Sequence, residues 1–234
     1  MQKTVLVTGC SSGIGLESAL DLTRQGFRVL AACRKAEDVA RMQDLGLTGI
    51  LLDLDDPQSV ERAAAEVIAL TDNRLYGLFN NAGYGVYGPL NTISRQQMEQ
   101  QFSANFFGAH QLTMLLLPAM TPHGEGRIVM TSSLMGLIAS PGRGAYAASK
   151  YALEAWSDAL RMELRHSGIQ VSLIEPGPIR TRFTLGPEAV VEKVRHAFTS
   201  DKPKLRYPVT LVTHAVALLK RLLPARAMDK IIHG

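Results

Sequence analysis

This 234-residue chain has few cysteines and tryptophans, 2 and 1 respectively, and it has no long apolar run. The cysteines, Cys10 and Cys33, are too few for a disulfide framework, which favours a reducing compartment. No signal peptide precedes the first strand-like segment, and no uncharged run reaches the length of about 18 residues that a membrane span needs. The net charge of +4 is small and the basic residues are scattered, so no nucleic-acid-binding face is expected. These absences predict a soluble, cytoplasmic protein.

What the chain does have is an alternation of two hydrophobic patterns. Nearly continuous apolar runs predict strands that are covered on both faces, at Thr4–Thr8, Arg28–Ala32, Gly49–Asp53, Gly77–Asn80, Gly126–Ser132 and Gln170–Glu175. Helical periodicity occupies the segments between and after them, at Gly15–Gln25, Pro57–Leu70, Ser94–Met120, Tyr146–Ser167 and Glu188–Phe198. Repeated strand–helix–strand order predicts an α/β fold, a doubly wound parallel sheet with helices on both faces. No linker or repeat divides the chain, so residues 1–234 are expected to form a single domain.

A glycine-rich turn joins the first predicted strand to the first predicted helix, in the stretch VLVTGCSSGIG. Gly9, Gly13 and Gly15 would let the backbone approach a phosphate closely, with a helix N-terminus aimed at it. Their spacing, G-x-x-x-G-x-G, departs from the commoner dinucleotide fingerprint G-x-G-x-x-G. The turn indicates a dinucleotide-binding site, and the alternative is a flexible turn that binds nothing.

The end of the second predicted strand bears on which dinucleotide binds. An NAD site expects an acidic residue there for the ribose 2′-hydroxyl, whereas this chain has Cys33-Arg34-Lys35. Arg34 could hold a 2′-phosphate through charge-assisted hydrogen bonds, and Ser11 could add a hydroxyl donor. We therefore expect NADP(H) rather than NAD. The alternative is that Arg34 and Lys35 are only the solvated start of the next helix.

A second group of chemically active side chains lies downstream, in the stretches TSS and YAASK. Tyr146 and Lys150 are four residues apart and share a helix face. The lysine ammonium is expected to favour the phenolate and to pull the pKa of Tyr146 down toward neutrality. This pair suits proton exchange with a carbonyl oxygen while a hydride moves at carbon. Ser133, which ends the TSS stretch, is on its own more typical of a turn or cap after a strand.

The motifs TGCSSGIG, NNAG, NFFG, TSS, YAASK and PGPIRT, in that order over nearly the whole chain, resemble the short-chain dehydrogenase/reductase family. The first of them, with Arg34 after the second strand, is similar to the hydroxysteroid and retinol dehydrogenase branch and to bacterial NADP-dependent aldehyde reductases. The resemblance implies a Rossmann-type fold and a catalytic group of four residues. Tyr146 would be the general acid or base, Ser133 would hydrogen-bond the substrate oxygen, and Lys150 would hold the nicotinamide ribose and depress the pKa of the tyrosine. Asn105, from NFFG, would position a proton-relay water behind the lysine.

The same resemblance implies a set of cofactor contacts and an oligomer. Beside Arg34, Tyr146 and Lys150, the positions that match are the pyrophosphate loop (Gly9, Ser11, Ser12, Gly13, Ile14, Gly15), the adenine site (Asp53, Leu54), the floor beside the ribose (Asn81, Ala82, Gly83) and the nicotinamide segment (Pro176, Gly177, Ile179, Thr181). The alternative for the last segment is a loop that merely blocks a helix. No metal is implied. A homodimer or homotetramer is implied, with Ser94–Met120 and Tyr146–Ser167 as its interface helices.

The chain departs from the family where a substrate lid is expected. Only Arg182 to Pro187 separate Thr181 from the next helical pattern, whereas the family has roughly a dozen to two dozen residues there. Either the site is unusually open or part of its lid is absent from the chain as given, and we expect the second. Besides Ser133, the candidate substrate residues are mostly apolar or aromatic: Tyr84, Tyr87, Leu134, Met135 and Phe183. They favour an apolar aldehyde, ketone or corresponding alcohol, with core packing as the alternative for each.

The sequence therefore predicts an NADP(H)-dependent oxidoreductase that acts as a reductase on such a carbonyl. The competing hypothesis is a non-catalytic NADP(H)-binding sensor or scaffold on the same fold, which would have no need of all four catalytic residues. A sugar epimerase or dehydratase is disfavoured by the glycine spacing. The apolar segment LVTHAVALLKRLLPARAMDKII near the C-terminus, with Lys220, Arg221 and Arg226, is expected to cover the domain or a partner subunit, and less readily a membrane surface.

Overall fold

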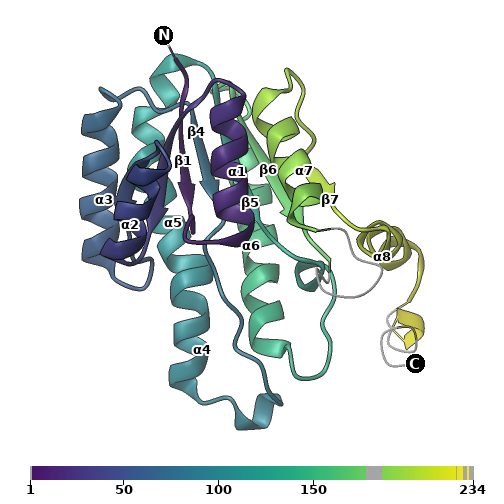
Figure 1. Ribbon diagram of the computed structural model, residues 1–234. Helices are drawn as coiled ribbons and strands as arrows, with labels where there is room; N and C mark the ends of the chain where they lie inside the picture. The colour runs from purple at the N-terminus through teal and green to yellow at the C-terminus, as the bar shows by residue number, and fades with distance from the viewer. Residues whose placement is uncertain (1, 178–185, 225, 229–230, 232–234) are drawn as a thin grey trace.

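The computed structural model describes residues 2–177, 186–224, 226–228 and 231, apart from the side chain of Arg221 (Figure 1). These residues form a seven-stranded parallel sheet in the order β3-β2-β1-β4-β5-β6-β7. Its strands are β1 (Thr4–Thr8), β2 (Arg28–Cys33), β3 (Thr48–Leu51), β4 (Gly77–Asn80), β5 (Gly126–Thr131), β6 (Ile169–Glu175) and β7 (Arg206–Pro208). The predicted single-domain α/β fold is confirmed, and each predicted strand is present with ends that shift by at most a few residues.

Helices pack on both faces of this sheet, as Figure 1 shows. They are α1 (Gly13–Arg24), α2 (Ala36–Asp44), α3 (Pro57–Leu70), α4 (Arg95–Phe102), α5 (Ala109–Leu116), α6 (Gly144–Glu163), α7 (Pro187–Thr199) and α8 (Leu211–Leu222). Asp56 caps the start of α3, because its side chain accepts a hydrogen bond from the backbone N–H of Gln58 at 3.0 Å, and Pro57 occupies the first turn. Among the described residues, none of the helices combines the length and hydropathy that crossing a bilayer would need.

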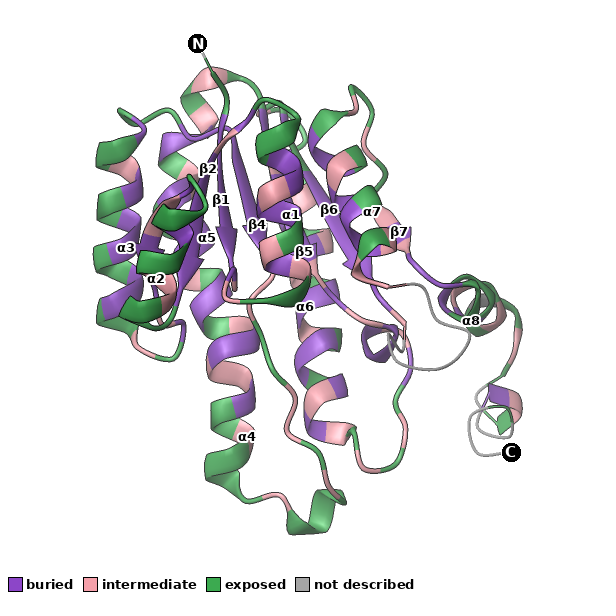
Figure 2. Cartoon of the chain, viewed as in Figure 1, coloured by how far each residue is buried: buried purple, intermediate pink, exposed green. Residues whose placement is uncertain are grey.

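Two hydrophobic clusters, one on each face, hold the helices to the sheet. Along β1, Leu6 belongs to the cluster that includes residues of α3, α5 and α6, while Val5 and Val7 belong to the cluster that includes residues of α1, α2 and α7. This division follows from the alternation of side chains along a strand. Because both faces are covered, β1 is buried along its whole length, as the continuous apolar run predicted. Figure 2 shows the buried sheet between helices whose outer sides are exposed.

The strand order reverses direction at β1, and this reversal positions the site. β1 pairs with β2 on one side and with β4 on the other, both in parallel. The connection after β1 leads toward β2, and the connection after β4 leads toward β5 on the opposite side of the sheet. The loops that leave the carboxyl ends of β1 and β4 therefore diverge, and the opening between them is where ligands bind in open α/β sheets.

Four features differ from the sequence-based expectation. The single helix predicted over Ser94–Met120 is divided, because a π-helical turn at Ser103–Gly108 separates α4 from α5 and a 3₁₀ turn at Leu117–Ala119 follows. Helix α2 was missed because its one buried residue, Met42, leaves almost no apolar periodicity. Strand β7 was missed because it is only three residues long and ends in a proline. Helix α8 lies within the C-terminal apolar segment, for which the sequence analysis specified no helix bounds.

Candidate active site

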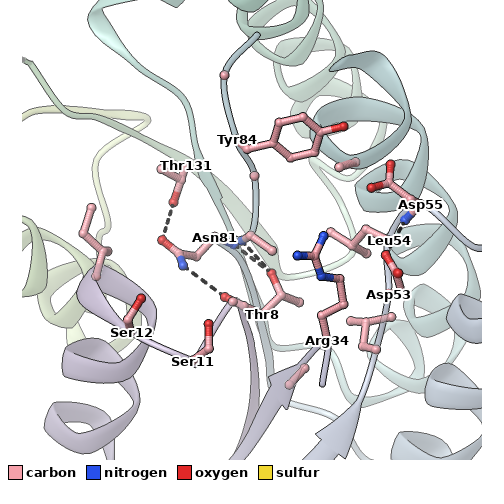
Figure 3. Close-up of a pocket in the computed structure, with 18 of the residues that line it drawn as sticks. Thr8, Ser11, Ser12, Arg34, Asp53, Leu54, Asp55, Asn81, Tyr84 and Thr131 are labelled. Atoms are coloured by element: carbon pink, nitrogen blue, oxygen red, sulfur yellow. Dashed lines mark hydrogen bonds between the residues drawn. The ribbon is translucent and has the colours of Figure 1, made fainter. Parts of the chain in front are cut away.

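A cleft of about 530 Å³ lies at the carboxyl ends of the central strands, where the strand order predicts a ligand site. It is lined mainly by residues that follow β1, β2, β3 and β4 (Figure 3). Tyr146 and Lys150 of α6 also line it. Twelve of the predicted cofactor residues line it: Gly9, Ser11, Ser12, Ile14, Arg34, Asp53, Leu54, Asn81, Ala82, Gly83, Tyr146 and Lys150. The structure thus gathers into one cavity residues that the sequence spreads over more than half of the chain.

The glycine loop is shaped by close contacts within the protein as well as by room for a ligand. Gly9 has φ +74°, a conformation that residues with a side chain rarely adopt. A Cβ on Gly15 would lie 2.2 Å from the carbonyl oxygen of Gly9, so no side chain fits there. Ser12 is the N-cap of α1, yet its side chain makes no capping hydrogen bond to that helix. The first turn of α1 therefore presents backbone N–H groups and the positive end of its dipole beside the cleft, which fits the phosphates of a dinucleotide.

A hydrogen-bond network fixes the opposite wall of the cleft and begins at Thr8, a residue that the sequence analysis missed. The Thr8 hydroxyl accepts hydrogen bonds from the backbone N–H groups of Asn81 and Ala82, each at 3.0 Å. The Asn81 amide donates to the Thr8 carbonyl at 3.0 Å and accepts from the Thr131 hydroxyl at 3.4 Å (Figure 3). The NNAG stretch is thereby tied to β1 and β5 before any ligand is considered. A threonine that ends a buried strand next to a glycine loop is the signal that could have identified it.

Arg34 and Asp53 line the cleft where the chain leaves β2 and β3. Arg34 follows β2 directly, and Figure 3 shows its guanidinium on the side of the cleft formed by Leu54 and Asp53. The Asp53 carboxylate accepts a hydrogen bond from the backbone N–H of Asp55 at 3.0 Å, which fixes the turn after β3. Arg34 is exposed. It makes no ion pair within the described part of the chain, unlike the neighbouring Lys35, which pairs with Glu37 at 3.3 Å. A cation in this position fits an anionic group on the ribose.

Tyr146 and Lys150 of α6 line the cleft, and Ser133 lies beside Tyr146. The Lys150 ammonium donates to the Thr131 carbonyl oxygen at 2.7 Å and lies 5.8 Å from the centre of the Tyr146 ring. The Tyr146 side chain is hydrogen-bonded to that of Ser133, which also accepts from the backbone N–H of Met135 at 3.1 Å. Ser133 is thus both the capping residue that the alternative proposed and a direct neighbour of the tyrosine hydroxyl.

The pKa of Tyr146 is raised, so the expectation that Lys150 would pull it down toward neutrality is wrong. Burial of the phenol raises the pKa, because it disfavours the phenolate, and the hydrogen bond with Ser133 lowers it only in part. The Lys150 ammonium cannot compensate, since its bond is made to Thr131 and its own burial lowers its pKa to about 8. At neutral pH Tyr146 is therefore a protonated phenol beside a charged lysine.

Asn105 is buried in the π-helical turn, and its amide is committed to the backbone of Tyr84. Its oxygen accepts from the N–H of Tyr84 at 2.9 Å, while its nitrogen donates to the Tyr84 carbonyl at 2.8 Å and to the Ser149 hydroxyl at 3.3 Å. A Cβ on Gly83 would lie 2.8 Å from that amide oxygen and 3.8 Å from the Lys150 nitrogen, so Asn105 stands next to the lysine. Through these hydrogen bonds Asn105 holds the loop after NNAG in place beside Lys150.

Several predicted site residues lie elsewhere. Leu134 and Met135 do not line the cleft, because they are buried in a cluster with Ile138 and residues of α8, which is the packing alternative. Pro176 accepts a backbone hydrogen bond from Leu134 at 2.8 Å and is also outside the lining, as are Gly177, Gly13, Gly15, Ser133 and Asn105. Tyr84 and Tyr87 do line it, and the Tyr87 ring centre is 5.9 Å from that of Tyr146. Ile179, Thr181 and Phe183 lie outside the described residues, as does most of the predicted lid region.

The cleft also contains residues that sequence reasoning did not select. Their shared feature is a place at or just beyond a strand end, or in the loop after NNAG: Thr8, Ala32, Leu52, Asp55, Gly85 and Thr131, with Ala104 from the π-helical turn. Most of them contribute backbone or apolar surface, so residue type alone gave no signal. Their position after parallel strands is the pattern that could have found them.

The parallel order, the uncapped helix at a glycine loop and the tyrosine–lysine pair define a dinucleotide-dependent oxidoreductase. The comparison with protein families agrees, because residues 3–187 match the family described as short chain dehydrogenase. The chain belongs to the short-chain dehydrogenase/reductase family of oxidoreductases. It is 75% identical over 256 residues to the oxidoreductase YbbO of Escherichia coli K12, whose name marks it as uncharacterized, and the alignment covers 100% of this chain and 95% of that protein.

Other relatives place the chain near the branch that the sequence indicated. Human retinol dehydrogenase 5 is 42% identical over 185 residues, which cover 77% of this chain and 58% of that protein. Among solved structures, a short-chain dehydrogenase from Streptomyces avermitilis superposes with a TM-score of 0.87 at 27% identity, covering 95% of this chain and 93% of the other. A metagenomic short-chain oxidoreductase in complex with NADP superposes with a TM-score of 0.79 at 28% identity, covering 89% and 96%.

Proposed function

We propose that this protein is an NADP(H)-dependent reductase of apolar aldehydes or ketones. The observation that carries the proposal is a single cleft lined by Tyr146 and Lys150 of α6 and by Arg34 after β2, with Ser133 beside Tyr146. Between them lie the first turn of α1 and the glycine loop, which suit a pyrophosphate. A dinucleotide bound along this cleft would supply a hydride to a carbonyl carbon next to Tyr146.

The protein's own part in that reaction is to place and move a proton. Because burial raises the pKa of Tyr146, its hydroxyl is protonated at neutral pH and is ready to donate to a carbonyl oxygen. The Ser133 hydroxyl, which already bonds that of Tyr146, would orient the same oxygen. Lys150 would hold the ribose and would stabilise the phenolate that is left after proton transfer. A phenol that starts protonated supports reduction rather than oxidation as the working direction.

The catalytic role is tested by NADPH oxidation against a panel of aliphatic, aromatic, retinoid and steroid carbonyls. Tyr146→Phe keeps the ring and removes the hydroxyl, so we expect turnover to fall by about 10²- to 10⁴-fold, the usual contribution of a positioned acid. Binding of NADPH, followed by its fluorescence, should change little. The matched control is Tyr151→Phe, on the same helix but outside the cleft, which should keep its turnover. Undiminished turnover of Tyr146→Phe would refute the mechanism, and NADPH binding without turnover of any carbonyl would favour the sensor hypothesis.

The choice of NADP(H) over NAD(H) rests on Arg34. Charge-assisted hydrogen bonds to a buried or partly buried phosphate contribute about 1.5–3 kcal/mol, which corresponds to roughly ten- to a hundredfold in affinity. Arg34→Asp should therefore weaken NADPH binding by about that factor while NADH binding changes much less. Lys35→Asp is the matched control, because Lys35 adjoins Arg34 but pairs with Glu37 and does not line the cleft. Equal losses for both dinucleotides in Arg34→Asp would contradict the assignment.

We also propose that part of the substrate lid is absent from the chain as given. The alignment with the Escherichia coli protein runs over 256 residues and includes this whole chain of 234, so that relative has about 22 additional residues inside the aligned region. We infer that they belong to the lid after Thr181, where this chain is short. An intact mass well above 25.5 kDa for the natural protein would show that lid residues are missing from the chain as given. A mass equal to that value would show instead an unusually open site.

We also propose that the protein is a homo-oligomer and that it is cytoplasmic. For a homodimer or homotetramer through α4, α5 and α6, the support is exposed apolar surface on this side, at Phe107 (58% exposed) and Leu115 (37%). Sedimentation velocity of the wild type and of Phe107→Gln tests the interface, because the variant should dissociate if that surface is used.

A cytoplasmic location is proposed from the free cysteines, Cys10 and Cys33, both of which are buried and unpaired with each other.

A further inference from the structure

Glu154 is a buried carboxylate on the active-site helix to which the proposed reaction gives no role. It follows Tyr146 and Lys150 at intervals of four residues along α6, so the three side chains share one side of that helix. Lys150 is 4% exposed and Glu154 7%. A charged carboxylate is costly to bury, and this one does not line the cleft, so its position needs a physical reason.

Glu154 and Lys150 both reach the carboxyl end of β5. The Lys150 ammonium donates to the carbonyl oxygen of Thr131, the last residue of β5, at 2.7 Å. The Glu154 carboxylate lies beside the next residue, Ser132, since a Cβ on Gly136 would be 2.5 Å from the Ser132 hydroxyl oxygen and 3.2 Å from Glu154 Oε1. The ammonium and the carboxylate therefore approach two consecutive residues from adjacent turns of one helix.

The charge of Lys150 has Glu154 as its main electrostatic partner. Within the described residues Lys150 forms no direct ion pair, because its ammonium bonds the Thr131 carbonyl. Tyr146 beside it is neutral, since its pKa is raised, and Thr131 and Asn105, which face it from β5 and the π-helical turn, carry no charge. Burial lowers the pKa of Lys150 to about 8, and the charge of Glu154 raises it. Without Glu154, the lysine would lose its proton at a lower pH.

Arg206, on β7, holds the Glu154 carboxylate in place at a distance of 3.3 Å. Burial raises the pKa of Glu154 and Arg206 lowers it, so this ion pair favours the charged form of Glu154. The same guanidinium lies 2.6 Å from an oxygen of Asp158 on α6 and 3.4 Å from an oxygen of Glu175 on β6. Arg206 therefore keeps two carboxylate partners when the charge of Glu154 is removed.

We propose that Glu154 is a positioning residue whose carboxylate, held by Arg206, keeps Lys150 protonated beside the cofactor ribose. This role rests on the proposed function, in which Lys150 binds that ribose and stabilises the Tyr146 phenolate. Glu154 touches neither substrate nor cofactor in this scheme and acts only through the charge of the lysine. The competing account is that Glu154 serves only to pack β7 through Arg206, which would leave the proton affinity of Lys150 unchanged.

The pH dependence of kcat/KM for NADPH distinguishes these accounts in Glu154→Gln, which keeps the size of the side chain and an oxygen that can accept from Arg206. An opposite charge a few ångströms away shifts a pKa by about one unit or more. The fall in kcat/KM that we expect near pH 8 in the wild type should therefore move to about pH 7 in the variant. At pH 8 the variant should be about fivefold below the wild type, and at pH 6 the two should be nearly equal.

Asp158→Asn is the matched control, because it removes an ion pair with the same arginine but lies two helical turns from Lys150. Its pH dependence should be that of the wild type. Glu154→Asp keeps the charge and should stay close to the wild type as well. Glu154→Met removes the charge without adding a polar group to the interior, so it should show the shift of Glu154→Gln and decides the question if that variant does not fold.

A direct titration of Lys150 separates this role from the proposed function. The ¹³Cε chemical shift of Lys150, assigned by its absence in Lys150→Arg, should have its midpoint at about pH 8 in the wild type and about one unit lower in Glu154→Gln. The role is overturned if the two midpoints agree, or if Asp158→Asn lowers the midpoint as much as Glu154→Gln does. A lowered midpoint in Glu154→Gln without turnover of any carbonyl would refute the proposed function alone and still support the effect of Glu154 on the lysine.

Discussion

Replacement of Arg206 by methionine should destabilise the protein strongly, because this one side chain neutralises a cluster of buried carboxylates. Arg206 extends from β7 and lies 2.6 Å from an oxygen of Asp158, 3.3 Å from Glu154 and 3.4 Å from Glu175. The side chains of Glu154 and Glu175 are only 9% and 0% exposed. Arg206→Met keeps much of the apolar volume and removes the cation from beside these carboxylates.

The magnitude follows from what the substitution leaves behind. Removal of one partner of a buried ion pair costs about 3–5 kcal/mol, because the remaining charge is still out of water. The Arg206 side chain is itself 29% exposed, so some solvent reaches the cluster and the lower end of that range applies. We therefore expect the free energy of unfolding to fall by about 3 kcal/mol at pH 8.

The loss should shrink in acid, and its sign can be worked out from Glu154. Burial raises the pKa of Glu154, while Ser132 and Arg206 lower it, so removal of Arg206 raises it further. A carboxyl group with a raised pKa binds its proton more tightly in the folded state than in the unfolded state. Stability therefore falls as pH rises through the interval between those two pKa values and stays low above it. In Arg206→Met that interval is wider, so the variant should recover part of its deficit near pH 5.

Urea denaturation at pH 5 and pH 8 measures both effects. Arg62→Met is the matched control, because its pair with Asp56 is exposed (69% and 48%) and should contribute at most about 1 kcal/mol. The double variant Arg206→Met/Glu154→Gln should regain part of the lost stability, because it also removes the Glu154 charge that no longer has Arg206 as its partner. A deficit of Arg206→Met that is no larger than that of Arg62→Met, or that is larger at pH 5 than at pH 8, would refute this reasoning.

Two further predictions concern the cleft. Gly15→Ala should lose about 1–3 kcal/mol of stability and most of its NADPH binding, because the new Cβ would lie 2.2 Å from the Gly9 carbonyl. Gly13→Ala meets no atom within 4 Å and should cost only the strain of its φ of +58°, about 1–2 kcal/mol. The two variants should therefore differ in NADPH binding, followed by fluorescence, more than in urea unfolding. Burial lowers the pKa of Lys150 to about 8, so kcat/KM for NADPH should fall as pH rises through about 8, when the lysine loses its charge. Lys150→Arg stays charged at that pH, and its own residual activity should not show this fall.

The sheet could be predicted because its strands are buried on both faces. The apolar runs around Leu6, Leu78 and Ile128 carry no polar alternation, and each became a central strand. Strand β7 could not be predicted in this way, because only Tyr207 of its three residues is buried. Its partner β6 and the ion pairs of Arg206 define it, and both are contacts between distant parts of the chain.

The site residues could be predicted where residue type and spacing alone indicate a chemical role. Gly9, Tyr146 and Lys150 follow from spacing and residue type, and the structure brings them to one cleft. The hydrogen bonds of Thr8 with Asn81, and of Asn105 with Tyr84, depend on how loops from separate strands meet. The raised pKa of Tyr146 likewise depends on burial and on the direction of the Lys150 side chain, which a four-residue spacing does not determine.

The hydrogen bonds of Thr8 with Asn81 and Ala82 give the cleft a rigid wall that needs no ligand to assemble it. A dinucleotide would therefore meet a preformed surface and would immobilise few protein side chains on arrival. Association should be a single kinetic phase whose rate rises linearly with dinucleotide concentration, with no plateau from a slow rearrangement of this wall. In Thr8→Val, which loses the bridging hydroxyl, such a plateau would be the expected sign of a wall that must first be ordered.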